Sequence, residues 1–364
     1  MAQAEDYVTF QYLQYDESNN RTSVSAPSIM LNKDFGTDYT LNASFVADTV
    51  SGASPTYYDA SSGASAYSRA HGVNKNNIAY GNVDFEEERF AGSALLTTRF
   101  SNRDELKVGG SYSSEHDFES IEGSGEYMHW LTGAKNNALS FGLSYQSNKI
   151  TVRCDDTIPC DASSGASQRK DASVFNAQLG FFQNLNTQSY IKASLFGVKE
   201  EGYLNNPYLN VIRNYNGTTA DIVGEQRPDT RTGFGASLRY ANALSTNTTL
   251  QVFYRFYDDD WGILSHTIDT DFYYTLARDW TFKVGIRGYQ QSRANFYSGK
   301  INHFTNEKYA ASDERLSNFN ALTYKSDIDY QVTKAFSLNL GANYYDQSTG
   351  LKATYFMTGF RYNF

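Results

Sequence analysis

The segment 351–364 alternates between two kinds of side chain. One parity holds Phe356, Phe360, Tyr362 and Phe364, with Thr358 between them, and the other holds Met357, Gly359, Arg361 and Asn363. Successive side chains on a β-strand point to opposite faces, so one face of this strand is aromatic and the other carries an arginine and an amide. The segment therefore predicts a strand between an apolar medium and a polar one.

The same period of two recurs along the chain, as in Leu250, Val252, Tyr254 and Phe256. No run approaches the roughly 20 apolar residues that a membrane helix needs. Aromatic residues make up 15% of the 364 residues, yet the apolar share is 40% and the mean hydropathy is −0.55. Such a chain is typical of a barrel with lipid outside and water inside. It predicts an all-β fold, a transmembrane antiparallel up-and-down β-barrel.

The pattern gives about sixteen strands in a single domain, 1–364. They fall near 6–15, 24–33, 38–51, 88–101, 105–116, 119–133, 138–153, 171–184, 188–203, 229–241, 247–257, 263–277, 280–298, 313–331, 335–346 and 351–364. Bacterial single-chain barrels have even strand numbers. Two soluble β-domains are the alternative, but no linker or change of composition divides the chain.

Connections between these strands alternate in length. Short polar turns are expected at 34–36, 102–104, 135–137, 186–187, 245–247, 278–279 and 333–334. The intervening connections include Ser-, Gly-, Asn- and Asp-rich stretches at 52–87, 154–170, 204–228 and 299–312, which we expect to be long extracellular loops. Both termini then lie on the periplasmic side.

The two ends of the chain predict where the protein is placed. Phe360, Tyr362 and Phe364 resemble the C-terminal assembly signal of bacterial outer-membrane β-barrels. Residues 1–5 fit a processed N-terminus, because Ala2-Gln3-Ala4 matches the surroundings of a signal-peptide cleavage site. The expected partners are therefore outer-membrane lipid, lipopolysaccharide and the barrel assembly machinery.

The chain has two cysteines, Cys154 and Cys160, close together in a polar stretch. In an oxidising compartment this spacing predicts a small loop disulfide. Zinc is the alternative, but no histidine lies nearby to complete a site.

Charge on the inward parity is concentrated in the second half of the chain. The lumen-lining candidates are Arg231, Arg239, Arg255, Asp269, Asp271, Lys283, Arg287, Lys325, Asp327, Asp329 and Arg361. The first half offers mainly small or neutral inward groups, such as Ser140 and Asn176. Basic and acidic strands side by side would make cross-strand ion pairs. These pairs either form a constriction that selects solutes or a self-neutralising ladder that rigidifies a wet wall.

Other chemistry is sparse in the sequence. The net charge of −9 and the absence of a basic cluster argue against nucleic acid. Two acidic stretches could hold a hard cation through oxygen ligands, but neither has the spacing of a calcium loop: Asp258, Asp259 and Asp260, and Asp84 with Glu86, Glu87 and Glu88. No Ser or Asp stands out as the partner of a histidine on a neighbouring strand, and no haem-attachment motif occurs. We expect neither an enzyme nor a cofactor.

Four short segments carry a family resemblance. They are 31–41 (LNKDFGTDYTL), 50–55 (VSGASP), 87–89 (EER) and 113–118 (SSEHDF). With them the chain resembles a family of proteobacterial outer-membrane β-barrel proteins of unknown function and porin-like character. The resemblance implies a periplasmic or lipid-anchored partner in a redox or secretion context, and it implies no catalytic residue.

Two functions remain open from the sequence. The protein is either a porin-like channel for small polar solutes or ions, or a plugged barrel that serves as a binding or assembly scaffold for a periplasmic or surface partner. The long loops are compatible with both.

Overall fold

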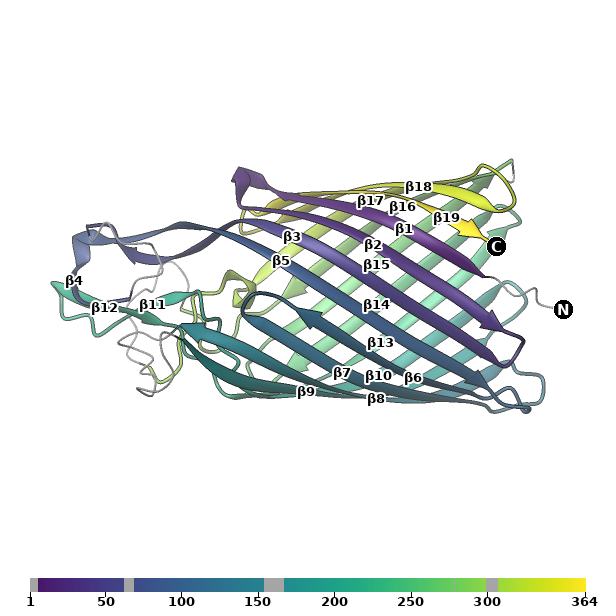
Figure 1. The fold of residues 1–364 in the computed structure, drawn as a ribbon, viewed down its shortest axis with the longest axis horizontal. Coiled ribbons are helices and arrows are strands. Elements are labelled where there is room, and N and C mark those ends of the chain that lie inside the picture. Colours follow the sequence, from purple (N-terminus) through teal and green to yellow (C-terminus); the bar gives the residue numbers. More distant parts are fainter. Residues whose placement is uncertain (1–5, 62–68, 154–166, 278, 299–306) are drawn as a thin grey trace.

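The computed structural model describes residues 6–61, 69–153, 167–277, 279–298 and 307–364. Within these ranges sixteen strands form one closed ring, in the order β1-β19-β18-β17-β16-β15-β14-β13-β10-β9-β8-β7-β6-β5-β3-β2. The strands run obliquely along the barrel (Figure 1). None of the helical segments in the described ranges has the length and apolar character needed to cross a membrane.

The ring is built from long strands. They are β1 (Tyr7–Glu17), β2 (Thr22–Phe35), β3 (Tyr39–Asp59), β5 (Ile78–Arg99), β6 (Glu105–Ser114), β7 (Phe118–Trp130), β8 (Asn137–Arg153), β9 (Ser167–Asn184), β10 (Ser189–Gly202), β13 (Thr230–Ser245), β14 (Thr248–Asp259), β15 (Leu264–Leu276), β16 (Trp280–Gln291), β17 (Phe319–Gln331), β18 (Phe336–Gln347) and β19 (Lys352–Asn363). A separate sheet contains β4 (Ala70–Asn74), β11 (Asn210–Arg213) and β12 (Thr219–Gly224). Three short 3-10 turns are η1 (Ser18–Asn20), η2 (Lys75–Asn77) and η3 (Glu314–Leu316).

The first and last strands close the barrel. β1 pairs antiparallel with β19 over its whole length, from Tyr7 opposite Asn363 to Glu17 opposite Ala353. Within the closed ring each strand has a paired neighbour on both sides, so the sheet has no unpaired edge there. The prediction of an antiparallel barrel of about sixteen strands is confirmed.

The outer face of the barrel is apolar. Each strand of the ring presents a large apolar side chain that stays exposed in the isolated chain: Phe10, Ile29, Phe45, Phe90, Val108, Ile121, Phe141, Leu179, Leu195, Leu238, Tyr254, Ile268, Val284, Tyr324, Leu340 and Phe356. A continuous apolar band around a closed sheet is the surface that lipid covers. The alternation read from the sequence thus has a physical cause, since every second side chain faces hydrocarbon.

The end where β1 begins and β19 ends, called the terminal end below, has short turns (Figure 1). All seven expected turns lie there, although Arg278 is outside the described residues. The carboxylate of Asp104 braces two of them. It accepts hydrogen bonds from the Tyr127 hydroxyl at 2.7 Å, the Asn102 amide at 2.7 Å and the Trp130 backbone N–H at 3.1 Å. Buried Asp104 therefore ties the turn after β5 to the end of β7.

At the opposite end, called the capped end, the structure differs from the expected long loops. Segment 52–87 is largely strand, because β3 continues to Asp59, β5 starts at Ile78 and β4 lies between them. Segment 204–228 contains β11 and β12. Their Ser-, Gly- and Asn-rich composition is typical of loops, but hairpin and cross-segment pairing supplies the backbone hydrogen bonds that make them strands.

Other boundaries also shift at the capped end. β16 ends at Gln291 and β17 begins at Phe319, so the expected strands 280–298 and 313–331 are each shorter. Residues 167–170 of the expected loop 154–170 belong to β9, and 154–166 lie outside the described residues. Of 299–312, only 307–312 are described, and Ala310 and Ala311 form isolated bridges with Gln226 and Tyr297.

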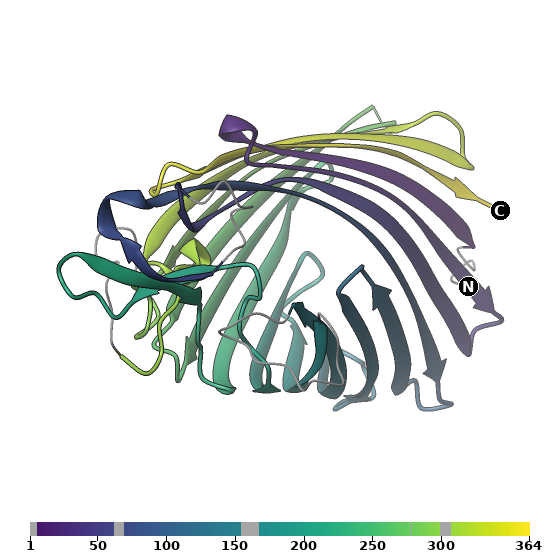
Figure 2. The same ribbon diagram turned by 60° about the vertical axis from the view of Figure 1, so that its left-hand side comes forward.

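We call three connections the cap: 56–61 with 69–78, 203–229, and 292–298 with 307–318. β4, β11 and β12 of the cap project beyond the barrel, as Figures 1 and 2 show. The three connections start at separate points of the ring. Strands β6 to β9 lie between the first and second connections, and β14 and β15 lie between the second and third. Strands β18, β19, β1 and β2 lie between the third and first connections. Contacts among all three must therefore cross the mouth of the barrel.

Hydrogen bonds make these contacts. The backbone N–H of Asn210 donates to the hydroxyl of Thr56 at 2.9 Å, and the hydroxyl of Ser312 donates to the carbonyl of Asn210 at 2.8 Å. A small buried cluster of apolar side chains joins β4 and β12 to β3 and β11: Tyr57, Val73, Ile212, Ala220 and Ile222. The cap thus has its own apolar core.

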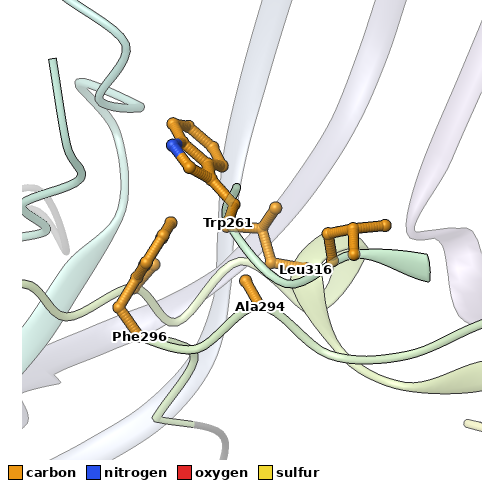
Figure 3. Packing of buried hydrophobic residues seen from close by; sticks show 6 residues of the cluster. Trp261, Ala294, Phe296 and Leu316 are labelled. Carbon is orange, nitrogen blue, oxygen red and sulfur yellow. The ribbon is translucent and has the colours of Figure 1, made fainter. Parts of the chain in front are cut away.

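A second apolar cluster fixes the cap to the rim of the barrel. It joins the β14–β15 connection to the β16–β17 connection and contains Trp261, Ile263, Ala294, Phe296, Ala311 and Leu316. Figure 3 shows Trp261 and Phe296 from these two connections, whose rings meet edge to face at a centroid separation of 5.0 Å. The indole N–H of Trp261 donates to the carbonyl of Thr230 at 2.8 Å, so the cluster is also tied to β13.

Candidate functional site: the lumen wall

The inner wall formed by β13 to β17 contains a charged recess of about 270 Å³. It is lined by Arg239, Gln251, Phe253, Asp269, Asp271, Lys283, Arg287 and Lys325. Six of these are charged residues that the inward parity singled out. Because they come from neighbouring strands in register, the sheet itself brings them together.

Lys325 is a largely enclosed cation of the recess, with 12% of its side chain exposed. Its Nζ lies 2.5 Å from Asp269 and 2.6 Å from Asp271. Both carboxylates are on β15, one strand beyond its neighbour β16. Lys325 reaches them across Gly285, where a Cβ atom would meet both its side chain and that of Asp271. A glycine at this position is therefore needed for the pair.

Two further ion pairs flank Lys325. Lys283 lies directly opposite Asp327, and their charged atoms are 3.1 Å apart. Arg287 lies opposite Asp269 and donates from Nε at 2.7 Å. The side chain of Arg287 is 52% exposed, so its terminal nitrogens face the lumen.

Arg239 and Arg255 are held differently, on aromatic rings. The guanidinium of Arg255 lies 4.7 Å from the ring centroid of Phe196, and that of Arg239 lies 5.0 Å from the centroid of Phe253. Arg239 also donates to Gln251 at 3.3 Å. Among the described residues neither arginine has a carboxylate partner. Cation–π contact stabilises a guanidinium while its in-plane N–H donors stay available.

At the capped end Arg231 is neutralised. It donates to Asp259 at 2.6 Å, lies 3.7 Å from Glu200, and stacks 4.7 Å from the centroid of Trp261. Asp259 also accepts from the backbone N–H groups of Trp261 and Ile263, each at 3.0 Å. This carboxylate shapes the turn after β14.

The weak cation candidate Asp258, Asp259 and Asp260 does not converge. Asp259 is occupied by Arg231 and its own turn, whereas Asp260 accepts from the backbone N–H of Thr232 at 3.0 Å. Asp258 has the opposite parity to Asp259 on β14 and pairs with Phe234 on the outer face. Alternation of side chains separates neighbouring acids in a strand, which is why the three carboxylates do not point to one place.

At the terminal end, the last two charged candidates make local contacts. Asp329 accepts from the amide of Asn339 at 2.9 Å. Arg361 lies 3.6 Å from the ring centroid of Tyr7 and donates to Asn363 at 2.9 Å. Arg361 therefore sits at the seam between β19 and β1, away from the recess.

The C-terminal aromatic residues Phe360, Tyr362 and Phe364 lie on the outer face and are exposed. The ring of Phe360 stacks on that of Phe10 across the seam, at 5.7 Å between centroids. Their role as an assembly signal stays a prediction. Cys154 and Cys160 lie outside the described residues, as do residues 1–5, so the disulfide and the processed N-terminus also stay predictions.

The first-half wall is less neutral than its small residues suggest. It contains cross-strand ion pairs between Lys107 and Glu126 at 3.2 Å and between Arg89 and Asp48 at 2.9 Å. Small polar groups such as Asn176 and Ser144 bond to one another beside them, at 3.1 Å. The expectation of a mainly neutral half missed these pairs because each partner lies on a different strand, far away in sequence.

Two other features were missed. Lys192 faces inward on β10, opposite Arg239, and lies 5.7 Å from the ring centroids of Phe182 and Tyr190. The parity of β10 was the signal that could have found it. Near the capped end, carboxylate oxygens of Glu87, Glu115 and Asp117 lie within 4.8 Å of one another. Burial raises the pKa of Glu115 and that of Asp117. Of this group, only Glu87 was a candidate from the sequence.

A closed sixteen-strand antiparallel sheet with an apolar outer face and a charged inner face defines a transmembrane β-barrel of the outer-membrane class. Within this class the chain belongs to the family described as "Protein of unknown function (DUF3570)", whose profile matches residues 1–359. The family resemblance found in the sequence is confirmed.

No curated protein matches the sequence. Several solved structures are similar to the chain at low identity. The ferric enterobactin receptor PfeA of Pseudomonas aeruginosa has 11% identity and a TM-score of 0.48; 94% of this chain is covered but only 54% of that chain, so the protein spans about half the receptor's length. OccK5 (OpdH) of P. aeruginosa has 6% identity, covering 100% of this chain and 99% of that one, with a TM-score of 0.46. The toluene transporter TodX of Pseudomonas putida has 10% identity, 100% and 90% coverage, and a TM-score of 0.45.

Proposed function

We propose that the protein is a channel in the bacterial outer membrane for small polar solutes or ions. The observation that carries the proposal is the state of Arg239 and Arg255, which face the lumen with no carboxylate partner among the described residues. An unpaired guanidinium in a dry interior would cost roughly several kcal/mol. These side chains therefore require water, and a hydrated lumen in a barrel of this size is an aqueous path.

The cap gives this channel a restricted outer mouth. Its three connections meet across the capped end, so solutes pass between or beside them. The channel is oriented with its termini in the periplasm and its cap outside the cell. This orientation follows the rule that short turns of such barrels are periplasmic and longer connections are extracellular. Lipopolysaccharide surrounds the capped end, and the barrel assembly machinery inserts the chain.

Single-channel recording in planar lipid bilayers tests the channel. Purified full-length protein is expected to give discrete current steps that increase linearly with voltage. Its folded state is checked on the same sample by the gel shift between unheated and boiled protein. Folded protein that gives no current in repeated insertions would contradict the proposal.

A second candidate function is a closed barrel that serves as a scaffold for a periplasmic, lipid-anchored or surface partner in a redox or secretion context. The hydrogen bonds and the apolar core that join the connections of the cap across the mouth favour it. This function requires a non-conducting barrel that copurifies with one partner in stable proportion. The bilayer recording and a mild-detergent pull-down therefore separate the two functions.

A further inference from the structure

The recess in the lumen wall has an excess of positive charge. Four of its lining residues are cationic, Arg239, Lys283, Arg287 and Lys325, and two are acidic, Asp269 and Asp271. Asp327, beside the recess, offsets one cation by pairing with Lys283. The protein as a whole has a net charge of −9. A cationic patch inside an acidic protein is a local feature that overall charge does not explain.

The cations of the wall fall into two groups. Lys325 and Lys283 donate to carboxylates and are largely enclosed, so their charge is used within the wall. Arg255 and Arg239 rest on rings instead, and Arg287 uses only Nε to bind Asp269. These three guanidiniums keep N–H donors directed at the lumen. A guanidinium presents its donors in a fixed fork that matches the two oxygens of a carboxylate.

Two of the three arginines, Arg239 and Arg287, line the recess, and Arg255 lies outside its lining. Arg239 lies opposite Phe253, Phe253 opposite Asp269, and Asp269 opposite Arg287, so these residues form one row across β13 to β16. Arg255 occupies the next inward position on β14 toward the capped end. Inward neighbours along a strand are about 7 Å apart and adjacent strands about 4.8 Å apart. One small solute can therefore contact more than one guanidinium.

Phe253 adds an apolar surface to this row. Its ring lies between the strands that carry Arg239 and Arg287, and it lines the recess. A recess of about 270 Å³ is slightly smaller than most ligand-binding pockets, which have about 300–1,000 Å³. The combination fits a small solute that has both an oxyanion and a short apolar body.

We infer that the channel binds and conducts small organic carboxylates, whose oxyanion is held by Arg239, Arg255 and Arg287. The inference rests on the proposed channel and names its solute class. Arg231, neutralised nearer the cap, is not part of the binding row.

Ion selectivity gives the first test. Wild-type protein in a planar bilayer with a KCl gradient is expected to show a reversal potential closer to the equilibrium potential of chloride than to that of potassium. This result indicates preference for anions. Preference for potassium would overturn the inference while leaving the channel itself intact.

Variants test whether the anion preference comes from these arginines. The double variant Arg239→Gln/Arg255→Gln is expected to lose most of the anion preference. Lys107→Gln is the matched control, because Lys107 is also a lumen cation but is paired with Glu126 on a distant part of the ring. An equal loss in both proteins would overturn the assignment. The gel shift between unheated and boiled samples shows that each variant is folded.

Direct binding keeps the inference testable without any current. Calorimetric titration of full-length protein in detergent uses benzoate, its neutral analogue benzamide, and inorganic phosphate. Benzoate is expected to bind more tightly than benzamide and phosphate, and to weaken about tenfold or more in the double variant, as expected for lost bonds to a charged group. Arg255→Lys keeps the charge but not the fork, and should weaken benzoate while retaining anion preference. Equal affinity for benzoate and benzamide, or tighter binding of phosphate than of benzoate, would overturn it.

Discussion

At the scale of single residues, glycines on the inner face decide how closely other groups approach. Gly285 lets Lys325 reach the carboxylates of β15, and Gly341 leaves room for the side chain of Asp327. Gly359 lies at the seam, where a Cβ atom would meet the backbone carbonyl oxygen of Phe10. A backbone atom cannot move aside as a flexible side chain can.

Gly359→Val should therefore weaken closure of the barrel. Overpacking of this kind costs about 1–3 kcal/mol. The heat-modifiability midpoint, measured by gel migration over a temperature series, is expected to fall. Gly123→Val on β7 is the control, because nothing lies within 4 Å of a Cβ atom there. Equal midpoints for both variants would show that the seam tolerates the side chain.

How much of the lumen wall the sequence predicts depends on parity and register. Parity alone identified six charged residues that the structure brings to the recess. The ion pairs could not be predicted from parity. Lys325 and Asp271 lie on strands that are separated by β16, and only the register shows that Gly285 lies between them. Rings that carry arginines, such as Phe196 beneath Arg255, depend on the same unpredicted register.

At the scale of elements, the cap contains a buried charged cluster. The Glu225 side chain is fully enclosed, accepts from the Asn206 backbone N–H at 2.7 Å and pairs with Arg227 at 2.5 Å. Arg227 also contacts Asp313 at 2.9 Å, and so joins the β10–β13 connection to the β16–β17 connection. Burial raises the pKa of Glu225 to about 7. The pKa of Asp313 is lowered to about 2, because its bonds to Arg315 and the charge of Arg227 outweigh burial.

These pKa values predict that the cap is more stable at pH 5 than at pH 8. The raised pKa of Glu225 means that its protonated form favours the closed cap, so its contribution is full below about 4.5 and is lost as pH rises through about 7. Asp313 contributes above about 3.8 and loses stability only as pH falls toward 2, outside this window.

Hydrogen exchange of peptides from β11 and β12, corrected for intrinsic rates, measures this effect. Protection is expected to fall at least about tenfold from pH 5 to pH 8. Glu225→Gln should remove most of the difference. Protection that rises with pH in the wild-type protein would contradict the assignment.

Loop composition misled the sequence prediction at the capped end. Segments 52–87 and 204–228 have the Ser, Gly and Asn content of loops, yet they contain long hairpin arms and a separate sheet. The contact of Asn210 with Thr56 joins residues far apart in sequence, and no local pattern predicts such a contact. The short turns of the terminal end, set by local backbone geometry, were predicted correctly.

At the scale of the whole molecule, one physical constraint explains most of the fold. Lipid outside and polar groups inside impose a period of two on every strand, and closure of β1 on β19 removes the sheet edge. The start of β1 and the end of β19 lie at the end opposite to the cap, which gives the barrel a direction in the membrane (Figure 1).

The direction is tested with epitope tags. A tag inserted after Gly217, in the turn between β11 and β12, is expected to bind antibody on intact cells. A matched tag after Thr187, in the turn between β9 and β10, should bind only after the outer membrane is permeabilised. The reverse pattern would mean that the termini lie outside the cell.

The central claim is a water-filled path through the barrel, and solute entry into proteoliposomes tests it most directly. Vesicles with folded full-length protein should swell in isosmotic solutions of small polar solutes faster than protein-free vesicles. The rate should fall as solute size increases, because the cap narrows the mouth. Swelling no faster than in protein-free vesicles, with protein that still shows its heat-dependent gel shift, would contradict the channel.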